Sequence, residues 1–351
     1  MKKLLTQTLT VIAGVSTLIF LVGCDRLFPP PERPVETPEQ RLEQANQTFR
    51  STVASAMQEA AKLAEVTIKT DNFVAIPLDD GSSVVVNAVI SGVENLTLEQ
   101  LAKGADVLFV FLRLPQGSGL PSGFYIVRFF QTPDTTQWRA QFKNLEGQVA
   151  LETDAEVGPG EVYQRGVPYI LVDHAKITVN AQASVPLGTG GPDTTPLAAE
   201  GQKIAQANAN FYQASREIIR KLKTQASVLV LNSVLKCSRD DVLVVHTAFQ
   251  GVEKLTLEQL ARGQDVFFGY FRTPQTSGLP SGFYTVRIAQ SATGEWLARF
   301  VNAKGNTVKE VPATVDRVEP PLQTTKLTMF LNEEGFGIGV NFDSIKIIIF
   351  D

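Results

Sequence analysis

The stretch GVENLTLEQLAKG at positions 92–104 recurs as GVEKLTLEQLARG at positions 251–263, and SGLPSGFY at 118–125 recurs unchanged at 277–284. When positions 92–131 are compared with 251–290, 28 of 40 residues are identical and no gap is needed. Self-similarity at a fixed spacing is typical of a repeated structural unit. The sequence therefore predicts that one domain has been duplicated.

The match extends beyond this stretch with small shifts in spacing. Gln44-Ala45-Asn46 aligns with Gln206-Ala207-Asn208, and Trp138 aligns with Trp296. Between the copies, positions 184–195 are rich in Gly, Pro, Ser and Thr, which is typical of a linker. We expect repeat domain 1 at 38–181, a linker at 182–195 and repeat domain 2 at 196–351, each with its own core and able to fold alone.

Each copy is predicted to open with a helix. TPEQ at 37–40 places a hydroxyl at the N-cap, a proline at the first helical position and a glutamine three residues after the cap, which is a capping box. Apolar residues then recur at helical spacing, and this pattern indicates a core face. They are Leu42, Ala45, Phe49, Val53, Met57 and Ala60 in the first copy, and Ile204, Ala207, Phe211, Ile218 and Leu222 in the second.

After each helix the apolar pattern changes to the period of strands. In the first copy we expect a short helix capped by Thr97 and Gln100, and strands at 66–76, 83–91, 106–114, 124–132, 137–145, 148–157 and 167–179. Tyr125 and Val127 alternate with Arg128, which indicates one dry and one wet sheet face and hence antiparallel pairing. The predicted fold class is α+β, in two tandem copies of a domain whose N-terminal helix packs on a curved antiparallel sheet.

The amino terminus has a different character. Lys2 and Lys3 precede a mostly apolar run that ends in Leu21-Val22-Gly23-Cys24. This ending resembles the lipobox of bacterial lipoproteins, in which the cysteine thiol receives lipid and the chain is cut just before it. The resemblance covers about 24 residues and implies a signal peptide at 1–23, lipid on Cys24 and a membrane-anchored position in the bacterial envelope, facing the periplasm or exterior. An uncleaved transmembrane anchor is the alternative.

A proline-rich stretch after the cysteine, PPPERPVETP at 29–38, indicates an extended tether, so lipidated Cys24 and the tether are expected to fill 24–37. If Cys24 carries lipid, Cys237 has no partner within the chain and no internal disulfide is expected. We interpret Cys237 as a small buried apolar residue, with a reactive or intermolecular thiol as the alternative.

Charge excludes one class of partner. The formal net charge is −4, and removal of Lys2 and Lys3 leaves 30 basic residues against 36 acidic ones. Nucleic acid is bound by clustered Lys and Arg, so no nucleic-acid partner is expected.

Catalytic and metal-binding patterns are sparse. His174 and His246 are the only histidines, and neither has the spacing of a metal ligand. The acidic pairs at 79–80 and 240–241 lack the alternating carboxylates of a calcium loop. We expect no metal, no cofactor and no enzymatic activity. A hydrolase with an unfamiliar site is one alternative, beside the two functions described below.

Two sets of residues are candidates for binding. Leu120 and Pro121, with their twins Leu279 and Pro280, lie in predicted hairpin loops, where the leucine either folds back to cap its own sheet or projects to bind a partner. The second set consists of strand arginines at matching places, which either form a stripe facing an acidic partner or lipid headgroup, or make cross-strand ion pairs on a solvated face. These are Arg113, Arg128, Arg272 and Arg287.

The sequence thus predicts a binding or assembly module, anchored to a membrane by lipid, whose partner is another envelope protein. The alternative is a carrier of apolar small molecules or lipids in a pocket between helix and sheet. A carrier is expected to have a cavity lined by Phe109, Phe111, Phe129 and Trp138.

Overall fold

The computed structural model describes most of the chain after the predicted tether. The described residues are 36–77, 84–113, 120–135, 137–155, 170–173, 176–179, 183–186, 197–222, 233–237, 243–273, 277–317, 326–332, 335–342 and 345–350. Residues Arg41–Asp351 form one compact unit.

The first repeat (residues 38–181) and the second repeat (residues 196–351) carry similar series of elements. Those of the first repeat are α2 (Pro38–Leu63), β1 (Ile68–Pro77), β2 (Val84–Ile90), η1 (Val93–Asn95), α3 (Leu98–Ala102), β3 (Ala105–Arg113), β4 (Gly123–Gln131), β5 (Trp138–Lys143), β6 (Val149–Asp154), β7 (Ile170–Asp173) and β8 (Lys176–Val179). Strand β9 (Ala183–Pro186) follows between the repeats. Those of the second repeat are α5 (Ala199–Leu222), β10 (Ser233–Cys237), β11 (Leu243–Ala248), η2 (Val252–Lys254), α6 (Leu257–Ala261), β12 (Gln264–Arg272), β13 (Gly282–Gln290), β14 (Trp296–Val301), β15 (Thr307–Arg317), β16 (Lys326–Asn332), β17 (Gly335–Phe342) and β18 (Ile345–Phe350).

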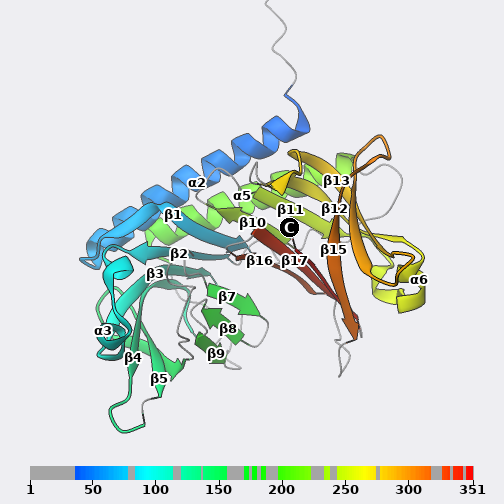
Figure 1. The fold of residues 1–351 in the computed structure, drawn as a ribbon. Helices are drawn as coiled ribbons and strands as arrows, with labels where there is room; N and C mark the ends of the chain where they lie inside the picture. The colour runs from blue at the N-terminus through cyan, green and yellow to red at the C-terminus, as the bar shows by residue number, and fades with distance from the viewer. Residues whose placement is uncertain are drawn as a thin grey trace, which may run out of the picture. The chain divides into compact units, whose positions relative to one another are not determined.

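The fold is α+β, with helices and antiparallel sheets, as the sequence predicts at this coarse level (Figure 1). Among the described residues, one 15-stranded sheet has the order β16-β17-β18-β15-β14-β13-β12-β11-β10-β1-β2-β3-β4-β5-β6, and β7, β8 and β9 form a separate 3-stranded sheet. The two repeats meet where β1 pairs antiparallel with β10, with Val74 opposite Cys237 and Ala75 opposite Lys236. The large sheet therefore runs through both repeats.

Local signals in the sequence predict the starts of α2 and α3 correctly. The side chain of Thr37 accepts a hydrogen bond from the backbone of Gln40, and the Gln40 side chain accepts one from the backbone of Thr37. The same reciprocal capping box starts α3 through Thr97 and Gln100. Its twin α6 begins in the same way through Thr256 and Gln259. Both predicted capping boxes of the first repeat are therefore confirmed.

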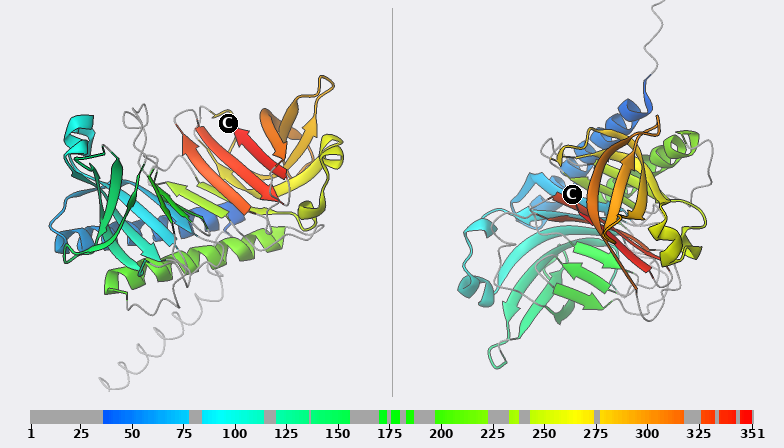
Figure 2. Two further views of the ribbon diagram at one scale, coloured as in Figure 1. Left: turned by 90° about the horizontal axis from the view of Figure 1, so that it is seen from below. Right: turned by 45° about the vertical axis from the view of Figure 1, so that its right-hand side comes forward.

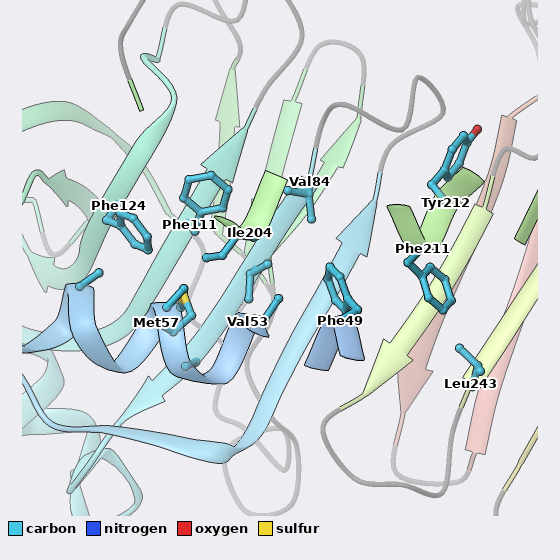
Figure 3. Packing of buried hydrophobic residues seen from close by; sticks show 14 of the residues in the cluster. Phe49, Val53, Met57, Val84, Phe111, Phe124, Ile204, Phe211, Tyr212 and Leu243 are labelled. Carbon is cyan, nitrogen blue, oxygen red and sulfur yellow. The ribbon is translucent and has the colours of Figure 1, made fainter. Parts of the chain in front are cut away.

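Among the described residues, the buried apolar side chains form three clusters. One, the first-repeat cluster, contains among others Leu108, Leu120, Tyr125, Phe129 and Phe142. Another, the second-repeat cluster, contains among others Val244, Phe267, Phe271, Leu279 and Phe300. The third, the shared cluster, takes residues from both repeats, and Figure 3 shows its central side chains. Its members include Leu42, Phe49, Val53 and Met57 of α2, Val84, Phe109 and Phe111 of β2 and β3, Ile204, Phe211 and Tyr212 of α5, and Leu243 and Tyr270 of β11 and β12.

The long helices α2 and α5 lie along the same face of the sheet (Figure 2) and each contacts strands of the other repeat. The rings of Phe49 on α2 and Phe211 on α5 lie 6.0 Å apart. Glu43 of α2 accepts a hydrogen bond of 3.1 Å from the hydroxyl of Tyr270 on β12. A Cβ atom added to Gly201 of α5 would lie 2.8 Å from the ring of Phe111 on β3. These contacts differ from the expectation of a separate core for each repeat, because the helices bury one apolar layer in common.

Burial on both sheet faces is a second difference from the expected one dry and one wet face. On β2, Val84 and Val86 belong to the shared cluster, whereas Val85 between them belongs to the first-repeat cluster. Leu222, expected in the helical core face, is 38% exposed because it is the last residue of α5. The period of a sequence shows which side chains share a face, but it does not show how many faces are covered.

Candidate functional site

The structure buries the leucine of both candidate loops. Leu120 is 2% exposed and belongs to the first-repeat cluster, and Leu279 is 5% exposed and belongs to the second-repeat cluster. The following prolines, Pro121 and Pro280, are exposed. Of the two interpretations of the leucines, the structure therefore favours the cap over the projecting contact, and it is the prolines that face outward.

The same hydrogen bond holds both loops, which we name the proline loops (residues 120–123 and 279–282). Tyr125 donates its hydroxyl to the carbonyl oxygen of Pro121 at 2.5 Å, and Tyr284 donates to that of Pro280 at 2.6 Å. Burial raises the pKa of Tyr284, so this hydroxyl stays protonated and remains a donor. A buried leucine on one side of each proline and a tyrosine bond on its carbonyl hold the loop in one conformation.

The four candidate arginines do not share one environment. Arg128 lies 3.4 Å from Asp106 and donates to the backbone oxygen of Gly104 at 3.0 Å. Arg287 donates to Asp265, the twin of Asp106, at 2.8 Å. These two arginines make the cross-strand ion pairs of the solvated-face interpretation.

Gly104 is required beside Arg128 for two reasons. Its φ is +105°, in the left-handed region, and an added Cβ would lie 2.6 Å from the guanidinium of Arg128. A side chain at this position is therefore disfavoured by both backbone conformation and space.

Arg272 lies instead beneath a helix of the other repeat. Its guanidinium is 3.0 Å from a carboxylate oxygen of Glu43, whose other oxygen accepts the bond from Tyr270. The side chain of Arg272 is 19% exposed and that of Glu43 is 33% exposed. This ion pair joins α2 to β12 and is not available to an acidic partner.

Arg113 is the twin of Arg272 and is half-buried. It stands opposite Val84 on β2, as Arg272 stands opposite Leu243 on β11. Within the described residues, no ion pair or hydrogen bond to its guanidinium is found. The four arginines thus do not act as one stripe.

The four aromatic residues expected around a carrier cavity are not brought together. Phe109 and Phe111 are buried in the shared cluster, whereas Phe129 is buried in the first-repeat cluster, with Trp138 packed against it. The two pairs belong to different clusters, so they do not line one cavity.

His246 is a residue whose setting the sequence did not reveal. It is fully buried on β11, and its ring makes an edge contact with Phe267 at 5.4 Å between centroids. Burial lowers its pKa to about 3. The apolar residues that surround it in the sequence were the available signal, but the strand period alone places it on either face.

Other predicted features fall partly or wholly outside the described residues. Cys24 with the signal peptide and tether, His174, and the acidic pairs at 79–80 and 240–241 lie outside them, as does the side-chain environment of Cys237. No cluster of three or more His, Cys, Asp or Glu side chains suited to a metal ion occurs in the described part of the chain. None of the described helices is long and apolar enough to span a membrane.

Comparisons with protein-family models, curated proteins and solved structures returned no match.

Proposed function

We propose that this protein is a lipid-anchored binding or assembly module of a bacterial cell envelope, without enzymatic activity, that presents two copies of one loop to another envelope protein. The observation that carries the proposal is the identical construction of the two proline loops. In each loop a buried leucine and a tyrosine hydrogen bond leave a proline exposed.

Loops that are already ordered favour binding. A loop already held in one conformation loses little conformational entropy when it meets a partner. Two such loops in one chain make the second contact intramolecular, so that weak contacts add through effective concentration. The 28 identities in 40 positions support a duplication as the origin of the two proline loops. We also propose that the sheet in each copy is curved.

Anchoring is the second part of the proposal and rests on Leu21-Val22-Gly23-Cys24. We expect Cys24→Ala to accumulate as an uncleaved precursor, because no other thiol near the signal accepts lipid. Mass spectrometry of the amino terminus checks this. Mature protein beginning at residue 24 in the variant would contradict it.

Crosslinking in the native membrane tests the loops. We expect the double variant Pro121→Lys, Pro280→Lys to lose the crosslinked envelope protein while its melting temperature is unchanged, because both prolines are exposed. The matched control is Pro133→Lys with Ala292→Lys, which adds two charges at exposed turn positions away from the proline loops. Equal crosslinking in the test and control variants would overturn the proposal.

A further inference from the structure

Arg113 and Arg272 occupy equivalent places in the two repeats. Each is the last residue of its strand, β3 or β12, and each stands opposite a buried residue of the shared cluster, Val84 or Leu243. Both side chains therefore lie on the sheet face that carries the long helices.

The two arginines differ in the side chain that the helix over them carries at the matching position. Arg272 meets Glu43 of α2 at 3.0 Å. Because Gln44-Ala45-Asn46 aligns with Gln206-Ala207-Asn208, the position on α5 that matches Glu43 is Ala205. The helix over the first repeat thus has a methyl group where the helix over the second repeat has a carboxylate.

The start of α5 lies over the strand that carries Arg113. Gly201 in the first turns of α5 approaches the ring of Phe111, which is two residues before Arg113 on the same face of β3. Glu200 in the first turn of α5 makes no ion pair with Arg113 within the described residues. The first backbone N–H groups of a helix have no acceptor within the helix, and they favour a negative charge.

We propose that Arg113 binds a carboxylate supplied by a ligand or by a partner polypeptide, in the place that Glu43 takes at Arg272. A half-buried guanidinium is partly removed from water, and an ion pair compensates for that loss. The planar guanidinium of arginine can donate two parallel hydrogen bonds to the two oxygens of a carboxylate. This site does not depend on the proline loops, so it goes beyond the proposed function.

Nitrogen-15 NMR of the Arg113 guanidinium in the full chain tests the proposal. We expect sodium acetate, but not sodium chloride at the same ionic strength, to shift the Arg113 Nε–H signal in a saturable way. A blocked peptide with one glutamate is the second probe. A response to the peptide alone assigns the carboxylate to a polypeptide, whereas a response to acetate shows that a free carboxylate suffices. No response to either probe overturns the proposal.

Two reciprocal variants give the sharper test. Ala205→Glu supplies the missing carboxylate from within the chain, so the acetate response of Arg113 is expected to disappear. Glu43→Ala removes the internal carboxylate from Arg272, so that arginine is expected to gain an acetate response. Arg113→Gln identifies the Arg113 signal, and Ala205→Glu decides the test if Glu43→Ala does not fold. An acetate response that persists unchanged in folded Ala205→Glu refutes the site.

Discussion

At the scale of single residues, His246 shows how one substitution between the repeats changes the chemistry of a buried position. Its twin in the first repeat is Asn87, which is also fully buried. Gly269 stands directly opposite His246 on β12, and a Cβ atom there would lie 2.7 Å from that of His246. Neither ring nitrogen of His246 has a hydrogen-bond partner in the described structure.

The buried histidine predicts a loss of stability in acid. Burial lowers its folded pKa to about 3 from 6.5, so below pH 6.5 the unfolded chain binds a proton that the folded chain does not. This group's contribution is present above pH 6.5 and falls by about 1.4 kcal/mol per pH unit down to pH 3. Urea unfolding is expected to show that the native protein loses roughly 2 kcal/mol more than His246→Asn between pH 7 and pH 5. Equal losses would show that His246 is not buried in the neutral form.

The loop leucines predict a stability effect in place of a binding effect. Leu120→Ala and Leu279→Ala are each expected to lower the free energy of unfolding by roughly 2–5 kcal/mol, because each leaves a cavity in its cluster. Leu63→Ala is the control, since Leu63 is 66% exposed and its loss is expected to change stability by less than about 0.5 kcal/mol. Chemical denaturation measures all three. Unchanged stability in the loop variants would restore the projecting interpretation.

At the scale of elements, α2 and α5 are stabilised by what they cover together. Neither helix buries its apolar face against its own repeat alone, because the shared cluster includes strands of both repeats. Most of the stability of a protein helix comes from such packing of an amphipathic face. The Glu43–Arg272 ion pair adds a polar contact across the same boundary.

The helix pair predicts a coupled response to substitution. Phe49→Ala and Phe211→Ala are each expected to lower the free energy of unfolding by roughly 3–5 kcal/mol, since both side chains are almost fully buried. Because the rings lie 6.0 Å apart, the double variant is expected to lose less than the sum, with a coupling of about 0.5–1.5 kcal/mol. A thermodynamic cycle from urea melts measures the coupling. Strict additivity would mean that the two rings do not stabilise each other.

At the scale of the whole molecule, the pairing of β1 with β10 and the shared cluster join the repeats. The strand pair continues one sheet across both repeats, and the helices cover it from one side. Separation of the repeats would expose the edges of two strands and a large apolar layer, both of which favour association.

This union predicts the behaviour of a chain cut between the repeats. With a protease site inserted at 182–195, the cut fragments are expected to elute together in gel filtration and to melt in one transition. Residues 38–181 and 196–351 expressed separately are expected to lack cooperative melting and to regain it when mixed. The uncut chain with the same insertion is the control. Fragments that separate and melt cooperatively alone would show that each repeat folds by itself.

The sequence by itself determined the local features of this protein. Its repeats predicted matching elements, its Thr–Gln pairs predicted the caps of α2 and α3, and its alternation predicted antiparallel strands. These features depend on residues a few positions apart, so their signals lie within short windows.

Only the tertiary structure decided how the repeats combine and which candidate residues face solvent. It paired β1 with β10, brought Glu43 to Arg272, left Arg113 without that carboxylate and turned Leu120 into its cluster. The hairpin-loop pattern was also consistent with a leucine that projects, and the capped helices were consistent with the two separate cores that we expected from the sequence. The choice depends on the apolar area that remote segments bury together, which no local pattern contains.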